Sequence, residues 1–582
     1  MPEPEGQQVG KKIYWGRIMG YRETYMYWKD AVREKHLLDE LDAIQNDDGQ
    51  IKERFIGDLP FGTAGLRGVL GAGTARMNRY VIGRATQGLA DHLLALRRDG
   101  MRMVIAYDSR KFSREFAEET ACVFAANGIE AFIFRELTSV PELSFAVRHL
   151  KADGGVVITA SHNPGEYNGY KVYAAYGGQL SPEESRAVTA CIEKLDPFTD
   201  IRRISFKDGT TSGRIREIGE EIDRLYYDRM LTLCGTEPAR DLKVVYTPLH
   251  GAGLRTAENV FPAAGIRNFA VVEEQRNPDG SFPTVSSPNP EDPGAMKMAV
   301  ELAGRLSADI AIGTDPDADR MGAALRQADG TYAMLTGNQI GCLLANYLLE
   351  RRQSEGRLRP SDYIVKSFVS TDMADAIARH YGIMSHTVMT GFRFIAELIV
   401  RNEKTDGEFL FGFEESYGFL AGTFALDKDG VLAALLLCKA AQFYRDRGQN
   451  LPDVLENLYR THGYYLEGVK NIAFKGLDGM ERMREIMAGL RAKPFSRVGG
   501  LAVNATEDYL ARTRTSAQGT VSDLEIAAGD AIKLILEGDS WICIRPSGTE
   551  PKIKIYYAAR ADTRETSQRR LETMSAAFEK MI

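Results

Sequence analysis

A serine follows closely on one strongly apolar run of this 582-residue chain. Residues 154–158 read Gly-Gly-Val-Val-Ile, and residues 159–165 continue as Thr-Ala-Ser-His-Asn-Pro-Gly. The pattern predicts a buried strand that delivers Ser161 into a turn. That turn would expose a hydroxyl, the imidazole of His162 and an amide together, and the amine of Lys171 follows further along the chain. The alternative is an ordinary polar turn at the end of a strand.

Three carboxylates at alternate positions follow a second apolar run. Asp315, Asp317 and Asp319 would repel one another unless a cation lay among them. Oxygen ligands without sulfur or imidazole suit Mg²⁺. A calcium-binding EF-hand is excluded, because its sixth and twelfth positions would be Arg320 and Arg326 instead of glycine and glutamate. The alternative to a magnesium site is a solvated acidic loop.

An acidic loop further along has the residue types for sugar recognition. Residues 412–418 read Gly-Phe-Glu-Glu-Ser-Tyr-Gly. The carboxylate of Glu414 can accept hydrogen bonds from two adjacent sugar hydroxyls, and Ser416 can add a third contact. An acidic surface loop is an equal alternative for this segment alone.

Two glycine-containing segments have the composition of anion sites. Residues 544–552 combine a guanidinium, hydroxyls and a glycine N–H in one tight turn, which can cradle a phosphate through Arg545, Ser547, Gly548 and Thr549. Residues 61–68, Phe-Gly-Thr-Ala-Gly-Leu-Arg-Gly, would let the backbone approach a ligand closely and would place Arg67 beside it. Hairpin or surface turns are the alternatives. The chain has no Walker pattern and no GxGxxG before a helix here, so a nucleotide-binding fold is not supported.

A weak internal repeat predicts the scaffold for these segments. A strand pattern, a helix pattern, a Gly-Ile pair and a second strand pattern recur from near Met103, Leu242 and Tyr363. In each copy a glycine would stop the helix in the left-handed conformation; these are Gly128, Gly265 and Gly382. Each copy is typical of a parallel β-loop-α-β crossover, so we expect three related α/β domains.

The C-terminal part has a different pattern. Residues 532–536, 541–544 and 553–556 are strand-like, and a helical pattern spans 564–581. We therefore expect three related mixed-sheet α/β domains plus a C-terminal α+β domain around a central cleft. The expected domains are 1–237, 238–338, 339–465 and 466–582, with a helical, aromatic-rich extension over about the first 55 residues.

Composition narrows the classes of function and compartment. With 73 basic and 80 acidic residues the net charge is −7, which argues against nucleic-acid or membrane-surface partners, so a phosphorylated ligand needs a local basic patch. The six cysteines are dispersed without a CxxC pair, which indicates a reducing compartment. We find no signal peptide and no apolar run long enough to span a bilayer. We expect a cytoplasmic protein that is a monomer or small homo-oligomer.

Taken together and in order, these segments resemble the motifs of the α-D-phosphohexomutases, the phosphoglucomutase and phosphomannomutase superfamily. The resemblance covers residues 61–552, with at least one motif in each expected domain. The long N-terminal extension, the Phe-Glu-Glu-Ser loop and the Leu-Asp-Lys-Asp-Gly segment at 426–430 look most like the long phosphoglucomutase/phosphopentomutase branch.

The resemblance implies a role for each matching residue. Ser161 would carry a phosphoryl group, whose phosphate joins the three aspartates as a ligand of Mg²⁺. His162, Lys171 and Arg67 would serve the transfer. The implied substrate-binding residues are Arg320, Gly391, Glu414, Ser416, Lys428, Arg545, Ser547, Gly548 and Thr549.

The implied reaction is reversible mutation of glucose 1-phosphate to glucose 6-phosphate through glucose 1,6-bisphosphate. Mannose or pentose phosphates as substrates stay open, as do a bisphosphate synthase that uses the same serine and a non-enzymatic sugar-phosphate-binding regulator. A phosphatase with Asp315 as nucleophile is disfavoured, because such enzymes need Thr or Val where Asp319 stands.

The proton-transfer group is not fixed by these motifs. Neighbours on an extended backbone point to opposite faces, so we expect no direct proton relay between Ser161 and His162. Lys171 is the family-matched candidate for charge stabilisation or proton transfer.

Overall fold

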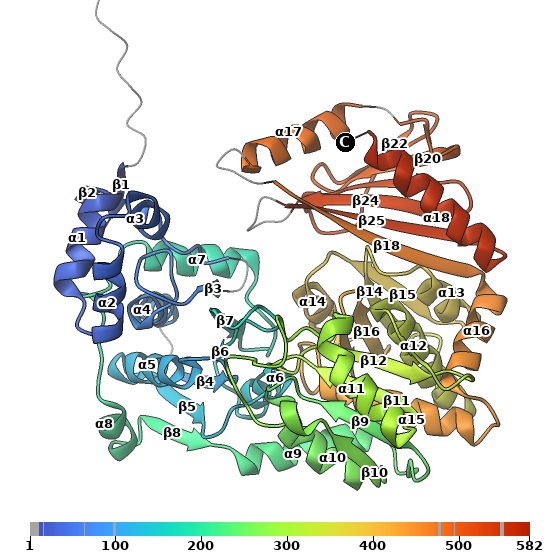
Figure 1. Cartoon of the computed structure of the whole chain (residues 1–582), viewed down its shortest axis with the longest axis horizontal. Helices are drawn as coiled ribbons and strands as arrows, with labels where there is room; N and C mark the ends of the chain where they lie inside the picture. The colour runs from blue at the N-terminus through green and yellow to red at the C-terminus, as the bar shows by residue number, and fades with distance from the viewer. Residues whose placement is uncertain are drawn as a thin grey trace, which may run out of the picture. The chain divides into compact units, whose positions relative to one another are not determined.

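The computed structural model describes residues 11–14, 17–62, 65–96, 100–474, 479–493, 495–546 and 552–581. Helices and strands alternate along most of the chain (Figure 1). The chain divides into two compact units. Unit 1 contains Met1–Met334 and Gly422–Cys438, and unit 2 contains Leu335–Ala421 and Lys439–Ile582.

The first sheet of unit 1 carries the serine segment. Its strand order is β3-β7-β6-β4-β5-β8, with β6, β4, β5 and β8 parallel and β3 and β7 antiparallel to their neighbours. All five residues of β6 are buried, as the Gly-Gly-Val-Val-Ile run predicts. The bounds are β3 (Gly65–Val69), β4 (Arg102–Tyr107), β5 (Glu130–Phe134), β6 (Gly154–Ile158), β7 (Tyr167–Ala174) and β8 (Ile215–Ile218).

Helices cover this sheet with apolar faces. The core includes Ile82 and Leu89 from α4 and Phe116 and Phe124 from α5, packed with residues of the strands. The helices of this part are α4 (Arg79–Ala95), α5 (Ser113–Ala126), α6 (Val140–His149), α7 (Pro182–Ile192), α8 (Phe206–Thr211) and α9 (Glu220–Cys234).

The N-terminal extension is helical from residue 21 onward. Its helices are α1 (Tyr21–Ala31), α2 (Lys35–Ala43) and α3 (Asp48–Phe55), and Trp28 and Phe55 anchor their shared core in edge contact. The expected helical extension is thus present, and two short strands that the sequence did not predict, β1 (Lys11–Tyr14) and β2 (Arg17–Gly20), pair antiparallel before α1. Backbone pairing between two short segments leaves little trace in hydrophobic periodicity.

The second sheet of unit 1 carries the aspartate segment. Its order is β10-β9-β11-β12-β13, parallel over β10, β9 and β11 and antiparallel from β11 to β13. The bounds are β9 (Lys243–Thr247), α10 (Gly253–Ala263), β10 (Asn268–Val271), η1 (Glu273–Gln275), α11 (Pro293–Leu306), β11 (Ile310–Thr314), β12 (Met321–Arg326) and β13 (Tyr332–Met334).

The first sheet of unit 2 repeats this arrangement. Its order is β15-β14-β16-β17, with only the last pair antiparallel. Its elements are α12 (Gly337–Ser354), β14 (Tyr363–Ser367), α13 (Met373–His380), β15 (Met384–Val388), α14 (Phe392–Asn402), β16 (Phe409–Glu414) and β17 (Gly418–Ala421). α15 (Gly430–Arg445) begins in the segment that belongs to unit 1 and continues in unit 2, where α16 (Leu451–His462) follows.

The C-terminal sheet is antiparallel throughout. Its order is β18-β25-β24-β23-β20-β21-β22, and β19 pairs with β20. α18 lies along this sheet in Figure 1, and Met574 and Phe578 of the helix enter its core. The bounds are β18 (Tyr464–Ala473), α17 (Gly479–Ala492), β19 (Arg497–Val498), β20 (Leu501–Asp508), β21 (Thr513–Ser516), β22 (Val521–Asp523), β23 (Ile532–Leu536), β24 (Ser540–Pro546), β25 (Lys552–Ala561) and α18 (Arg564–Glu579).

The repeat predicted from the sequence is confirmed. β4–α5–β5, β9–α10–β10 and β14–α13–β15 are each a helix between two parallel, adjacent strands. The glycine after each helix has positive φ: 80° at Gly128, 86° at Gly265 and 71° at Gly382. The α/β fold class with an additional C-terminal α+β domain is therefore correct.

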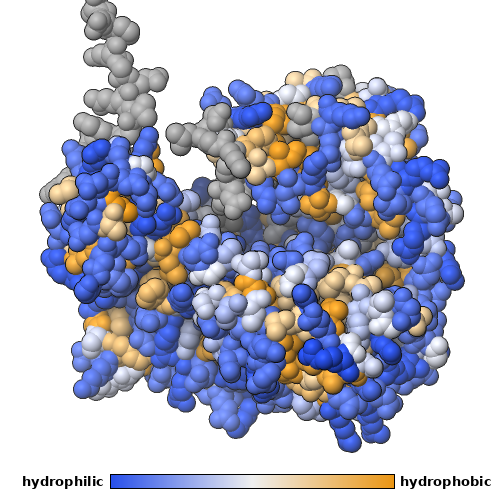
Figure 2. Space-filling model, viewed as in Figure 1, coloured by the Kyte–Doolittle hydropathy of each residue, from blue (hydrophilic) through white to orange (hydrophobic). Residues whose placement is uncertain are grey.

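Hydrophilic residues predominate on the face of the molecule drawn in Figure 2, and hydrophobic residues form separate patches on it. Within the described ranges, none of the helices combines the length and the hydropathy needed to cross a bilayer.

Candidate active site

Ser161 follows the end of β6 in an unusual backbone conformation. Its φ is 52°, in the left-handed region that residues with a Cβ seldom adopt, and the residue is buried. The Ser161 Oγ donates a hydrogen bond of 2.6 Å to Oδ2 of Asp315 and lies 3.2 Å from Nδ1 of His162. The expectation that the side chains of Ser161 and His162 point apart is therefore wrong, because it assumed an extended backbone at the serine.

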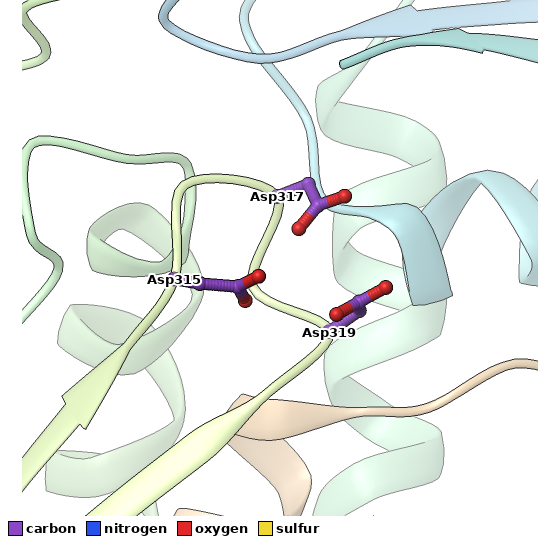
Figure 3. A group of neighbouring side chains, drawn as sticks. All are labelled: Asp315, Asp317 and Asp319. Carbon is purple, nitrogen blue, oxygen red and sulfur yellow. The ribbon is translucent and has the colours of Figure 1, made fainter. Parts of the chain in front are cut away.

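The three aspartates occupy the turn between the antiparallel strands β11 and β12. Figure 3 shows their carboxylates turned toward a common space inside this turn. One oxygen from each lies within 4.8 Å of the others, and all three residues are buried. The turn is held by a 2.9 Å hydrogen bond from the Arg320 N–H to Asp315 Oδ1 and by a left-handed Ala318 with φ 53°.

These carboxylates fit a divalent cation. Oδ1 of Asp317 and Oδ1 of Asp319 are buried and accept no hydrogen bond from the described residues. Burial, followed by repulsion from Asp317 and Asp319, raises the pKa of Asp315 well above its usual range. Three ionised carboxylates in this space therefore need added positive charge, and an all-oxygen ligand set suits Mg²⁺.

Two lysines pair with Asp317 and Asp319. The Lys171 ammonium, on β7, lies 2.7 Å from Asp317 Oδ2 and 3.5 Å from Asp319 Oδ2. Lys428 Nζ lies 3.0 Å from Asp319 Oδ2. Burial alone would raise the pKa of Asp319, but Lys428, Lys171 and Arg320 outweigh it and hold that pKa below its usual value.

Lys428 lies in the segment Gly422–Cys438, which packs with residues 1–334 as part of unit 1. This packing brings Lys428 to the aspartates. The Gly430 N–H donates to the carbonyl of Ala318 at 2.9 Å. A Cβ on Gly430 would lie 2.5 Å from the Arg320 carbonyl oxygen, so only glycine allows this approach. Asp427 accepts from Lys428 Nζ at 2.9 Å and from the Tyr173 hydroxyl at 2.8 Å, which fixes the lysine.

His162 is held in its neutral form. Burial lowers its pKa well below the usual value, and the nearby Arg320 and Arg67 lower it further. The Ser287 hydroxyl donates to its backbone carbonyl at 2.6 Å. A neutral imidazole beside a serine hydroxyl can accept or return a proton.

Arg67 lies on β3, at the edge of the same sheet. The strand pairs Arg67 with Gly169 of β7, and its guanidinium donates to Asn163 Oδ1 at 3.1 Å. The side chain is exposed, so it can meet an anionic ligand beside the serine loop.

The predicted sugar loop lies in unit 2, at the end of β16. Glu414 is buried, and its Oε1 accepts from the N–H of Gly391 at 2.7 Å. Gly391, with φ 115°, precedes α14. Oε2 of the next residue, Glu415, accepts from Ser367 Oγ at 2.9 Å. Ser416 lies in the turn that leads into β17.

The predicted phosphate loop is only partly described. Arg545 lies on β24, where it pairs with Lys554 of β25 and is partly exposed. Ser547, Gly548 and Thr549 lie outside the described residues.

The structure thus brings the predicted residues together in two groups. Unit 1 joins the serine, its histidine, both lysines, Arg320 and the aspartates; unit 2 joins Gly391 and Glu414. Sequence reasoning missed Asp427, which holds Lys428, and the pair Asp108 and Arg110, which lies under the serine loop. The Asp-Ser-Arg triplet at the end of the first repeat's strand was the available signal for that pair.

The fold and the first group define an α/β enzyme of phosphoryl transfer. Family models of phosphoglucomutase/phosphomannomutase match residues 58–198 (alpha/beta/alpha domain I), 224–330 (domain II), 336–462 (domain III) and 510–575 (C-terminal domain). The chain belongs to the phosphoglucomutase/phosphomannomutase family, and it is a mutase.

Individual relatives agree with this assignment. A phosphoglucomutase of Staphylococcus aureus (strain MRSA252) is 39% identical over 514 residues, which are 88% of this chain and 91% of the relative. A phosphoglucomutase of Staphylococcus epidermidis (strain ATCC 12228) is 38% identical over 505 residues, 87% and 91% of the two chains.

Solved structures share the fold at lower identity. The open form of parafusin, a phosphoglucomutase from Paramecium, has a TM-score of 0.67 at 16% identity, covering 90% of this chain and 94% of its own. A putative phosphomannomutase from Thermus thermophilus has a TM-score of 0.65 at 22% identity, covering 90% and 99%.

Proposed function

We propose that this enzyme interconverts glucose 1-phosphate and glucose 6-phosphate through a phosphoserine at Ser161 and a glucose 1,6-bisphosphate intermediate. The observation that carries the proposal is the 2.6 Å hydrogen bond from Ser161 Oγ into the group of three buried aspartates. Glucose as the sugar is supported by the name phosphoglucomutase of relatives that are 38–39% identical over most of the chain.

Asp315, Asp317 and Asp319 would hold Mg²⁺, together with the phosphate on Ser161. When bound, this ion supplies positive charge that stabilises the phosphoryl group in transfer. A fold neighbour from Aspergillus fumigatus, with a TM-score of 0.50, is described as a complex with magnesium and GlcNAc-6P.

The proposed transfer conserves the phosphoryl group. The bond from phosphorus to Ser161 Oγ breaks as a bond to the free sugar hydroxyl forms, and the proton of that hydroxyl passes to Ser161 Oγ. The bisphosphorylated sugar then turns around and returns its other phosphoryl group to Ser161 Oγ, and the Oγ proton passes to the sugar oxygen that leaves. We assign His162 Nδ1 as the carrier of these protons, because it lies 3.2 Å from Oγ on a neutral ring.

Two cationic side chains, Lys171 and Arg67, would stabilise the negative charge of the transferring phosphoryl group and would not carry a proton. The Lys171 ammonium is paired with Asp317 and Asp319, beside the serine loop, where it adds positive charge. We therefore assign it to charge stabilisation. Arg67, exposed beside the serine loop, would contact the transferring phosphoryl group.

The remaining predicted residues would bind substrate. Glu414, Gly391 and Ser416 would recognise sugar hydroxyls, and Arg320 and Lys428 would contact the substrate from the aspartate turn. The non-reacting phosphate would be held by Arg545, Ser547, Gly548 and Thr549.

Compartment and assembly are part of the same proposal. A cytoplasmic location is supported by the six dispersed cysteines, five of which are buried. We propose a monomer or small homo-oligomer with sugar phosphates as its partners.

A coupled assay with purified enzyme tests the function. Glucose 1-phosphate, mannose 1-phosphate and ribose 1-phosphate are compared with Mg²⁺ and a catalytic amount of glucose 1,6-bisphosphate. We expect the highest kcat/KM with glucose 1-phosphate. A higher kcat/KM with another sugar would make that sugar phosphate the substrate. Turnover only with an added phosphoryl donor would indicate a bisphosphate synthase.

Mass spectrometry tests the phosphoserine. After incubation with glucose 1,6-bisphosphate, we expect a phosphopeptide that contains Ser161, and Ser161→Ala should remove both the phosphopeptide and the activity. Ser287→Ala, which changes a second serine beside the same loop, should keep the phosphopeptide. Full activity of Ser161→Ala would end the proposal, and binding without turnover would favour a regulator.

A further inference from the structure

Arg110 is a buried arginine whose guanidinium binds the loop that carries Ser161. It follows β4, and its side chain has no exposed surface. Nη2 donates to the carbonyl of Ser161 at 2.5 Å and also to that of Asn163. Nη1 donates to the carbonyls of Pro164 at 2.9 Å and Tyr167 at 3.0 Å. One guanidinium thus binds four carbonyl oxygens between residues 161 and 167.

The loop needs such support because Ser161 has φ 52°. A residue with a Cβ keeps this conformation only where its surroundings impose it. The conformation matters for chemistry, since it turns the Ser161 hydroxyl toward Asp315 and His162 together. A relaxed loop would lose that geometry without any change in the reacting groups.

Arg110 is itself fixed by Asp108. The Asp108 carboxylate accepts from the Arg110 backbone N–H at 2.9 Å and lies 3.4 Å from its Nε. The same carboxylate accepts from Thr159 Oγ1 at 2.6 Å, and Thr159 Oγ1 accepts from the N–H of Ser161 at 2.8 Å. Ser161 is therefore tied on both its N–H and its C=O to one buried ion pair.

A second element closes over the guanidinium. The ring of Phe282 lies 4.9 Å from the guanidinium carbon, and a Cβ on Gly280 would come within 2.4 Å of the Lys111 nitrogen. This packing excludes water from the arginine. Only a planar fork with several donors can reach four carbonyls from one buried position, and the three donors of a lysine cannot.

We propose that Arg110 is a positioning residue for phosphoryl transfer, which holds Ser161 in its left-handed conformation through the four carbonyls of the loop. The inference rests on the proposed role of Ser161. Arg110 touches neither the sugar nor the transferring group in this account; it acts through the backbone that presents the serine.

The test compares Arg110→Lys with Arg84→Lys. Arg84 is also a buried arginine of unit 1; it donates to one carbonyl, that of Ile192, at 3.1 Å and pairs with Asp58 at 3.0 Å. Both variants keep a buried cation, so a general loss of packing should affect them alike. The measurements are kcat, KM, melting temperature and backbone hydrogen exchange of peptides covering residues 155–170.

We expect Arg110→Lys to lower kcat by about 10²-fold with KM for glucose 1-phosphate within about threefold, since positioning acts on the reacting geometry. Exchange in the serine loop should accelerate while the remaining peptides match wild type. Arg84→Lys should keep kcat within about threefold and the loop protected. Equal effects of the two variants on kcat, or wild-type protection of the loop in Arg110→Lys, would overturn the proposal.

A second variant covers the case in which Arg110→Lys does not fold. Asp108→Asn keeps the shape and removes the charge that holds the arginine, so loop exchange and kcat should change in the same direction but less. Unchanged exchange in Asp108→Asn would overturn the proposal. Hydrogen exchange is independent of turnover, so it also separates this inference from the proposed function, whose failure would show as a wild-type enzyme without phosphoserine.

Discussion

The Ser161 hydroxyl donates a 2.6 Å hydrogen bond to Asp315 although 154 residues separate the two in the chain. Each lies just beyond a strand that runs parallel to a neighbour in its own sheet, and ligand-binding residues gather at such strand ends. The hydroxyl points into a group of three carboxylates, two of which have a buried oxygen that accepts no hydrogen bond from the described residues. The predictions below test what this arrangement requires.

Asp317→Asn should lower kcat by about 10²-fold or more, because it removes one of the charges that hold the cation. In wild type the melting temperature should rise with added Mg²⁺, and this rise should be lost in the variant. Asp309→Asn is the matched control, since Asp309 precedes the same strand and accepts from the Lys243 N–H at 2.8 Å. If Asp317→Asn kept both its activity and the Mg²⁺-dependent rise in melting temperature, the aspartate turn would not be the metal site.

Glu414→Gln should lower kcat/KM about 10-fold to 10²-fold for every sugar phosphate tested, as charge-assisted hydrogen bonds are lost. Phosphorylation of Ser161 by a small phosphoryl donor should survive. Glu415→Gln serves as the comparison, because the Glu415 carboxylate is next to Glu414 in the chain and already accepts a hydrogen bond from Ser367. Normal kinetics of Glu414→Gln would place sugar recognition elsewhere.

Arg545→Ala should raise KM for glucose 1-phosphate and lower kcat/KM about 10²-fold, a cost of about 3 kcal/mol in transition-state binding. The reason is that a mutase must hold the phosphate that does not react. Ser161 phosphorylation and melting temperature should stay near wild type. Arg514→Ala removes an arginine of the same sheet that pairs with Glu507 and should be neutral in the assay. Equal kinetics for the two variants would show that Arg545 does not bind the phosphate of the substrate.

Asp429→Asn should flatten the pH dependence of stability. Burial raises the pKa of Asp429 to about 6 from a usual 3.8, so its contribution is fully present below pH 3.8 and is lost as pH rises through 6. The free energy of unfolding of wild type should fall by about 1 kcal/mol from this group between pH 5 and 7.5. The amide oxygen of asparagine can still accept the hydrogen bond from the Leu432 N–H in the first turn of α15.

Chemical unfolding at several pH values measures this effect as the difference between wild type and variant. Asp47→Asn is the control, because Asp47 also begins a helix but is exposed, and its pKa is lowered by the Gln50 N–H. Its curve should parallel that of wild type above pH 5. A wild-type slope retained in Asp429→Asn would show that Asp429 is ionised throughout.

The sequence predicted what local patterns determine. Strand-helix-strand units and their closing glycines follow from short-range periodicity and from one residue's tolerance of positive φ. The left-handed Ser161 could not be predicted in this way, because Arg110, 51 residues earlier, imposes it. The partners of Lys428 were missed for the same reason, since Tyr173, which orients Asp427, lies 254 residues before it.

The return of Gly422–Cys438 to unit 1 has a consequence for biosynthesis. Residues 1–334 leave the ribosome first, yet the aspartate turn then lacks Lys428, and the Ala318 carbonyl lacks its partner Gly430. Unit 1 cannot be completed until the first segment of unit 2, Leu335–Ala421, has been translated. A nascent chain arrested before residue 422 would carry three buried carboxylates without one of their cations, so the enzyme matures late, and a fragment cut at residue 334 is an incomplete domain rather than a smaller enzyme.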